Sequence, residues 1–314
     1  MKDKNKLKGY VAAIVSATTF GFINLFTVPL LRAGYDPTVI LCYRASLASV
    51  GLALYMLLAR IPFRVKRSDI PFLLLGGCLY FFSAWFLLLG YGYLHSGLAT
   101  ALHFSYPIFV TLLLLMTFGV VPGRRAILSI LMAVVGVGCL SLISLKGGEG
   151  LNFIGIPVVL LSGLSYSIYI ILLRYSRLSR FPGFRVTLYV MMTNAILFGL
   201  TSYLKLGEFP ILATPMEWTN VILLALIPTI VSNLALVIGV QTIGSSRTSI
   251  LGALEPVTAL MIGILVFAEP FSWGQALGVG LIVASVILVI LDRSENSELT
   301  SPKDRRILKK QQHV

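Results

Sequence analysis

Apolar runs of about 20 residues recur along the whole chain and constrain its fold more than any other feature. Because an α-helix rises about 1.5 Å per residue, each run can cross a hydrocarbon layer of roughly 30 Å. Backbone polar groups inside a bilayer must bond to one another, which favours helices. We expect ten spans, at residues 9–31, 37–59, 72–94, 98–119, 126–145, 153–174, 186–204, 218–243, 248–267 and 272–291. The sequence therefore predicts an all-α integral membrane protein with ten transmembrane helices.

Composition and charge exclude two other classes of protein. The chain is 57% hydrophobic and 12% charged, whereas a soluble domain carries roughly 25% charged residues. Its net charge of +13 does not indicate a nucleic-acid partner, because the basic residues form short clusters between apolar runs rather than one stripe. The three cysteines lie inside apolar runs without metal-ligand spacing, and no nucleotide-binding motif occurs. We therefore expect no metal and no cofactor.

The basic clusters also indicate how the chain is oriented in the bilayer. Placing both termini inside puts the basic residues of segments 60–67, 124–125 and 174–185 and the basic tail in the cytoplasm, and leaves Arg32, Lys146 and Lys205 outside. This asymmetry follows the positive-inside rule. We expect a multi-pass protein of the cytoplasmic (inner) membrane with both termini cytoplasmic.

The two halves of the chain contain matching residues. At a constant offset of 149 residues, Gly90 aligns with Gly239 and Pro107 aligns with Pro256. Two five-helix units explain this match, and an odd number of spans inverts the second unit in the membrane. The expected organisation is a cytoplasmic tail (1–8), a first repeat (9–145), an extracytoplasmic linker (146–152), a second repeat (153–291) and a basic cytoplasmic tail (292–314).

Specific motifs resemble those of a known family. They are Gly-Leu-Ala-Thr-Ala-Leu-His-Phe-Ser-Tyr-Pro at 97–107, Ser-Ser-Arg-Thr-Ser-Ile-Leu-Gly-Ala-Leu-Glu-Pro at 245–256, Phe-Ala-Glu-Pro at 267–270 and the helix at 274–291. The chain resembles the EamA family of the drug/metabolite transporter superfamily. This resemblance implies two inverted five-helix repeats around a central cavity, and export of amino acids or related metabolites from bacteria. Val120 departs from the motif, because it occupies the position that matches Glu269.

Polar residues inside the expected spans are candidates for function. Glu255 could couple protons or bind an amine, or a neighbouring helix could simply satisfy it. Arg44 could attract a carboxylate or anchor the fold, and His103 could be a substrate ligand or a buried neutral ring. Tyr106 lies 149 residues before Glu255, so we expect these two residues to face one pore axis.

The candidate residues fall into three groups by expected role. Substrate-binding or coupling candidates are Arg44, His103, Tyr106, Tyr166, Asn233 and Glu255. Cavity-lining candidates are Asn24, Tyr80, Trp85, Tyr93, Tyr169 and Gln241. Hinge candidates are Pro107, Pro228 and Pro256, because proline removes a backbone donor and kinks a helix.

These residues predict a secondary transporter that works by alternating access, rather than an enzyme. A membrane-embedded lipid-processing enzyme and a channel are the alternatives, but the sequence contains neither a clustered catalytic set nor a filter motif. The expected partners are a small-molecule substrate and membrane lipids. We expect a monomer, with a dimer through Gly274 and Gly278 as the alternative.

Overall fold

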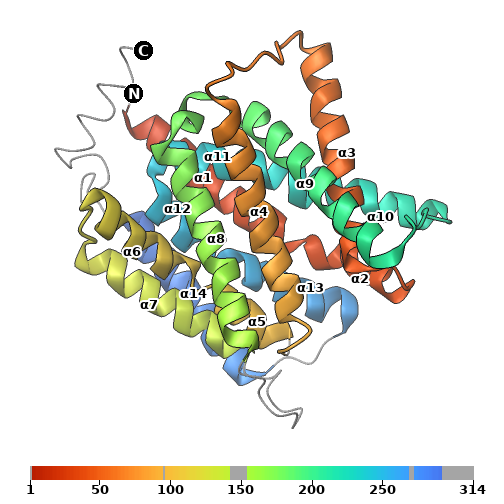
Figure 1. The fold of residues 1–314 in the computed structure, drawn as a ribbon. Coiled ribbons are helices and arrows are strands. Elements are labelled where there is room, and N and C mark those ends of the chain that lie inside the picture. The colour runs from red at the N-terminus through yellow and green to blue at the C-terminus, as the bar shows by residue number, and fades with distance from the viewer. Residues whose placement is uncertain (1, 95, 142–153, 269–271, 292–314) are drawn as a thin grey trace.

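The computed structural model describes residues 2–94, 96–141, 154–268 and 272–291, and no strand occurs in these segments (Figure 1). The helices are α1 (Lys2–Gly21), α2 (Ile23–Arg32), α3 (Pro37–Leu58), α4 (Ile70–Gly90), α5 (Ser96–His103), α6 (Tyr106–Phe118), α7 (Arg124–Ser141), α8 (Gly155–Tyr175), η2 (Arg177–Arg180), α9 (Gly183–Leu206), α10 (Pro215–Ala225), η3 (Leu226–Val231), α11 (Ser232–Ile243), α12 (Ser245–Leu251), α13 (Leu254–Phe267) and α14 (Trp273–Leu291). The prediction of an all-α protein is confirmed for the described residues.

Nine helical stretches of the described chain are long and apolar enough to cross a membrane, which makes this a multi-pass membrane protein. They coincide with nine of the ten expected runs. The other run, at 126–145, coincides with α7, whose described part ends at Ser141. The expected linker (146–152) and C-terminal tail (292–314) lie outside the described residues. The first helix begins earlier than expected, because α1 includes residues 2–8.

Four of the expected spans are broken rather than continuous. The first divides into α1 and α2, the fourth into α5 and α6, and the ninth into α12 and α13. The eighth contains a π-helical segment, η3, between α10 and α11. The hinge candidates Pro107, Pro228 and Pro256 lie at the last three of these interruptions. Each proline lacks the N–H that would bond to the carbonyl four residues earlier.

The π segment shows how such a lost bond is replaced. Pro228 cannot donate to the carbonyl of Leu224, so the Thr229 hydroxyl donates to that oxygen instead, at 2.8 Å. A side-chain bond of this kind satisfies the freed carbonyl inside the bilayer. The interruption is therefore a stable part of the fold.

The helices pack in pairs that join the two halves of the chain. Helix α1 packs against α11, α4 against α8, α3 against α9 and α7 against α14. In the last pair, a Cβ added to Gly278 would lie only 2.6 Å from the Gly136 carbonyl oxygen. The small residue at 278 therefore permits close packing within the chain.

A polar clasp holds α3 and α9 together at one end. Asp36 caps α3 by accepting a bond from the Thr38 N–H at 2.8 Å, and its other oxygen lies 2.6 Å from Lys205 Nζ. Burial raises the pKa of Asp36, but the hydrogen bonds from Lys205 and Thr38 outweigh burial, so the pKa lies below its ordinary value of 3.8. The clasp is therefore charged at neutral pH.

Candidate functional site

A small cavity lies where the two halves of the chain meet. Its volume is about 20 Å³, which holds about one water molecule. Helices from both halves contribute to its lining. The polar and aromatic lining residues are Ser16, Phe20, Tyr106, Tyr166, Ser232, Thr248, Ser249 and Glu255. A substrate of several heavy atoms needs more room than this cavity offers in the present conformation.

Glu255 supplies the carboxylate of the cavity. It lies in the first turn of α13, directly after the break that separates α12 from α13. Among the described residues, its side chain has neither a hydrogen bond nor a salt bridge, and it is partly exposed to the cavity. Negative charge is favoured at a helix N-terminus, which offsets part of the burial. A carboxylate in this position can accept bonds from a ligand.

Tyr106 and Glu255 come together as the 149-residue offset predicts, because both line this cavity. The Tyr106 hydroxyl lies against Gly252 at the other break, where an added Cβ would be 1.8 Å from that oxygen. The Gly252 backbone, with φ −55° and ψ −23°, suits any residue. Space, rather than backbone strain, therefore requires glycine here.

Each break also packs against a glycine of a helix from the other half. A Cβ on Gly21 of α1 would lie 2.7 Å from the Glu255 carbonyl oxygen. A Cβ on Gly163 of α8 would lie 3.0 Å from the His103 carbonyl oxygen. The two breaks are thus held in place by the same kind of close helix contact.

His103 is fixed by two serines and lies near the cavity tyrosines. Its Nδ1 is 2.8 Å from Ser162 Oγ, and Ser162 Oγ donates to the Ser83 carbonyl at 2.6 Å. The Ser162 hydroxyl donates its single proton to the Ser83 carbonyl, so toward His103 it can only accept a hydrogen bond. In the neutral ring, Nδ1 therefore carries the N–H that donates to Ser162 Oγ. Nε2 is then left as an acceptor. The ring centroid lies 5.8 Å from the centroids of both Tyr106 and Tyr166.

Arg44 is buried beside the cavity and donates hydrogen bonds to two side chains of the protein. Its Nε donates to Thr229 Oγ1 at 2.6 Å, and one terminal nitrogen donates to the Tyr80 hydroxyl at 3.3 Å. Its guanidinium carbon lies 5.4 Å from the centroid of the Phe20 ring. Arg44 is not part of the cavity lining. These contacts tie α3 to the π segment, so the anchoring role has direct structural support.

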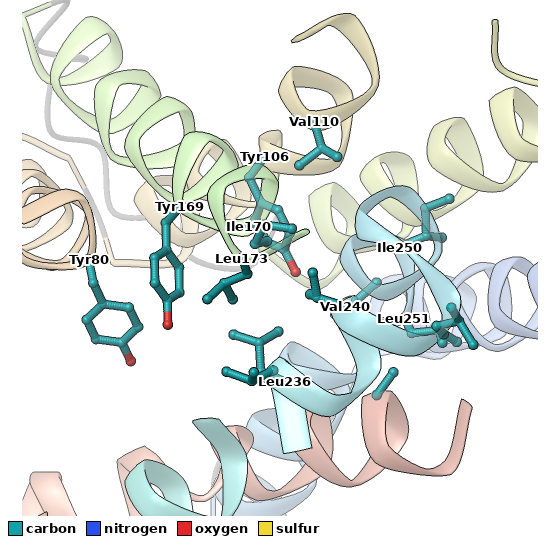
Figure 2. Packing of buried hydrophobic residues seen from close by; sticks show 14 of the residues in the cluster. Tyr80, Tyr106, Val110, Tyr169, Ile170, Leu173, Leu236, Val240, Ile250 and Leu251 are labelled. Atoms are coloured by element: carbon teal, nitrogen blue, oxygen red, sulfur yellow. The ribbon is translucent and has the colours of Figure 1, made fainter. Parts of the chain in front are cut away.

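A tyrosine cluster continues from the cavity into the core. Tyr166 packs edge-to-face on Tyr106, with ring centroids 4.9 Å apart, and Tyr80 packs on Tyr169 at 5.4 Å. Figure 2 shows the labelled tyrosines beside Ile170 and Leu173, which face Leu236 across the same core. The Tyr169 hydroxyl is buried with no partner among the described residues. Of this cluster, Tyr106 and Tyr166 reach the cavity.

The other predicted residues lie away from the cavity lining. Asn24 is exposed on α2, and Tyr93 is 42% exposed after α4. Trp85 stacks on Phe81 in a separate cluster. Gln241 donates to the carbonyls of Leu178 and Phe181 and so holds the turn at η2.

Asn233 and the hinge prolines belong to the scaffold around the cavity. Asn233 is buried and donates to the Thr229 carbonyl at 2.8 Å, which supports the π segment.

Among the described residues, no group of three or more His, Cys, Asp or Glu side chains could hold a metal ion.

Several residues of the site were missed from the sequence. They are the hydroxyl residues Ser16, Ser162, Thr229, Ser232, Thr248 and Ser249, together with Phe20 and Gly252. Two of them could have been found. Thr229 follows an in-span proline, and Gly252 lies 149 residues after His103.

Comparison with known proteins identifies the family. The model of the EamA-like transporter family matches residues 7–142 and again residues 153–291. The chain belongs to the EamA-like transporter family. The resemblance in the motifs at 97–107 and 245–256 is therefore confirmed, as is membership of the drug/metabolite transporter superfamily.

Two relatives of this EamA-like chain are uncharacterized transporters. One, from Synechocystis, is 28% identical over 72% of this chain and 66% of its own length. The other, from Archaeoglobus fulgidus, is 30% identical over 43% of this chain and 47% of its own length. The matches thus span less than two thirds of both relatives. A crystal structure of another protein has the same fold, with a TM-score of 0.76 over 90% of this chain and 96% of that chain, at 19% identity.

Proposed function

We propose that the protein is a secondary transporter that exports amino acids or related small metabolites across the bacterial cytoplasmic membrane by alternating access. The observation that carries this proposal is the cavity itself. It bears one carboxylate, lies at two helix breaks, and has room for about one water molecule in this conformation. Substrate can reach Glu255 only if the packed helices separate on one side.

The pattern of helix packing supports two inverted repeats of five spans. The first helix of each half packs against the broken helix of the other half: α1 contacts α13, and α8 contacts α5 and α6. The pairs α3 with α9 and α7 with α14 join equivalent spans, and α4 packs on α8 as α11 packs on α1. The family model also matches each half separately. In this proposal the repeats occupy 9–145 and 153–291, and α7 is the tenth span.

Opening then consists of rocking one repeat against the other. The breaks near Pro107 and Pro256 and the π segment at Pro228 serve as hinges, because their backbones lack some of the bonds that stiffen a helix. The Arg44 contacts to Thr229 and Tyr80 keep the scaffold joined during this movement.

The proposed orientation has both termini in the cytoplasm, because the basic clusters then lie inside. It is tested with single cysteines placed at two exposed positions, Glu208→Cys after α9 and Arg67→Cys before α4. An impermeant thiol reagent should label position 208 in intact cells and position 67 only after permeabilisation. The reverse pattern would overturn the orientation.

Transport is tested by counterflow in proteoliposomes. Unlabelled amino acid inside the vesicles should accelerate uptake of labelled amino acid, because a carrier exchanges its cargo across one site. Glu255→Gln should reduce this exchange by about tenfold or more, the loss expected from removing a charged hydrogen-bond partner. Glu208→Gln, at an exposed carboxylate, is the matched control and should exchange normally.

Three results would contradict parts of this proposal. Flux that internal substrate does not accelerate indicates a channel. Normal exchange by Glu255→Gln removes that residue from the site. Export is tested separately by efflux from preloaded cells, and accumulation above the external concentration would reverse the proposed direction.

A further inference from the structure

The oxygen atoms of the cavity differ from those of an ordinary polar pocket, because most of their protons are already used. Ser232 donates its hydroxyl proton to the Ser16 carbonyl at 2.9 Å. Thr248 donates to the Gly244 carbonyl at 2.8 Å, and Ser249 donates to the Ser246 carbonyl at 2.7 Å. Carbonyl oxygens only accept, so the direction of these bonds is fixed.

The fourth hydroxyl of the lining, on Ser16, follows from the same reasoning. Ser16 Oγ and Ser232 Oγ lie 3.4 Å apart. Since the Ser232 proton goes to a carbonyl, Ser16 must donate to Ser232 in this pair. All four aliphatic hydroxyls therefore offer the cavity lone pairs rather than protons.

The other lining groups share this preference for a positively charged donor. Glu255 contributes a carboxylate without a partner among the described residues. The rings of Tyr106 and Tyr166 contribute faces with negative electrostatic potential, which attract cations within about 6 Å of a ring centroid. The two tyrosine hydroxyls are the donors that remain in the described lining.

Arg44 is the cation that could receive a substrate carboxylate, and its Nε donates to Thr229 while one terminal nitrogen donates to Tyr80. Its guanidinium also lies over Phe20, a residue of the lining, while Arg44 itself is outside it. A substrate carboxylate in the cavity would therefore find no cation among the described lining residues and would lie beside Glu255.

We propose that this cavity recognises the ammonium group of its substrate, with Glu255 as the counter-ion and Tyr106 and Tyr166 as an aromatic wall, and that it does not bind a carboxylate group. This inference rests on the proposed transport function and specifies which part of the cargo the site recognises. An ammonium group supplies three donors, which matches a lining of acceptors. Amines and amino-acid esters are substrates of the same site as amino acids.

The test uses four chemically matched probes on each of two skeletons. For leucine they are leucine, leucine methyl ester, isoamylamine and N-acetylleucine, and the phenylalanine set is built in the same way. Binding to the full-length protein in detergent is measured by calorimetry. The ester and the amine should bind within about threefold of the amino acid or more tightly, whereas the N-acetyl probe should bind about tenfold more weakly or worse, because it has lost the positive charge of the ammonium group.

Variants of the lining separate charge, ring and hydroxyl. Glu255→Gln should weaken binding of the ammonium probes by about tenfold or more. Tyr166→Leu, which removes the ring face, should weaken it by about three- to tenfold, and by more than Tyr166→Phe, which keeps the ring face and removes the hydroxyl alone. Glu208→Gln is the control for loss of a carboxylate elsewhere. Gel filtration and melting temperature check that each variant is folded.

Three outcomes overturn the inference: equal binding of the N-acetyl probes, binding of the amino acids that is more than about tenfold tighter than that of both ester and amine, or normal binding by Glu255→Gln. Failure of transport is a separate result. A protein that binds the ammonium probes but shows no counterflow keeps this inference and rejects the proposed function. A protein that exchanges N-acetyl amino acids as fast as amines does the opposite.

Discussion

The break between α5 and α6 and the break between α12 and α13 share one backbone arrangement but carry different chemistry. The breaks, at residues 104–105 and 252–253, are 148 residues apart, and the prolines that follow them, Pro107 and Pro256, are 149 residues apart. The first break carries His103 and Tyr106, whereas the corresponding residues of the second are Gly252 and Glu255. The ring at 103 thus corresponds to a residue with no side chain, and the phenol at 106 corresponds to a carboxylate.

The difference makes one site out of two similar structures. Because position 252 is empty, the Tyr106 side chain can extend across and lie against the opposite break. Because only the second break carries an acid, the cavity contains one carboxylate among its described lining rather than two that would repel each other. The shared backbone provides two places where helices are interrupted, and the differing side chains decide which chemical groups line the cavity between them.

Adding a side chain at position 252 should have the largest effect on this arrangement. In Gly252→Ala, the new methyl group would lie 1.8 Å from the Tyr106 hydroxyl. The rigid ring must move, so we expect a destabilisation of about 3 kcal/mol, at the upper end for an overpacked site. Thermal unfolding of the purified protein measures it, and counterflow should fall together with stability.

A second substitution separates this clash from a general effect of alanine. Tyr106→Phe removes the clashing oxygen and leaves the ring carbon Cζ 3.2 Å from the new methyl group. The double variant should therefore recover about 1 kcal/mol or more, a coupling expected for residues in contact. Gly280→Ala, where no atom lies within 4 Å of an added Cβ, is the control. An unchanged melting temperature for Gly252→Ala would disprove the contact.

Alanine substitution should destabilise the protein more at Gly21, which packs against the second break, than at Gly163, which packs against the first. In Gly21→Ala the methyl group would lie 2.6 Å from Thr258 Cβ and 2.7 Å from the Glu255 carbonyl oxygen. In Gly163→Ala the nearest atom, the His103 carbonyl oxygen, is 3.0 Å away. We expect Gly21→Ala to destabilise by about 2 kcal/mol and Gly163→Ala by about 1 kcal/mol, measured by thermal unfolding.

Helix propensity favours alanine over glycine by roughly 0.5–1 kcal/mol, so a variant without a clash should gain stability. The Gly280→Ala control shows the size of that gain in α14. If Gly163→Ala proved more harmful than Gly21→Ala, the second break would not be the more tightly packed of the two.

The sequence predicts the spans well and the breaks only in part. Apolar runs determine which segments lie in the bilayer, and these runs coincide with the helices. Proline identifies where a helix lacks a bond, but whether it bends or breaks depends on packing, as at Gly21 and Gly163. The offset of 149 residues pointed to Tyr106 and Glu255 together, and both line the same cavity.

The residues that were missed share a physical reason. Serine and threonine are common in transmembrane helices and usually bond to their own backbone, so Ser162 and Thr229 look ordinary in the sequence. Their roles depend on contacts with His103 and Arg44 from other helices. Amides and aromatics showed the opposite error. The polar side chain of Gln241 bonds to the carbonyl of Leu178 and holds a turn, and it does not line the cavity.

The smallest expected effect tests the orientation of the histidine that makes the first break differ from the second. Ser162→Ala removes the oxygen that accepts from His103 Nδ1 and leaves the Ser83 carbonyl without that donor. Loss of the bond between His103 and Ser162 corresponds to about 1 kcal/mol, so counterflow should fall by about fivefold. Nitrogen NMR of histidine-labelled protein should show the Nδ1–H form of His103 in the wild type and a mixture of both tautomers in the variant.

The NMR readout distinguishes positioning from mere loss of stability. A His103→Gln sample assigns the signal, because the chain contains three histidines. Ser129→Ala removes a buried hydroxyl that bonds only to the carbonyl of Arg125 in its own helix, and should leave the His103 tautomer unchanged. If Ser162→Ala slowed transport while His103 kept its Nδ1 proton, the serine would act through packing alone. The chemical difference between the two breaks would then reside in Tyr106 and Glu255, without the histidine.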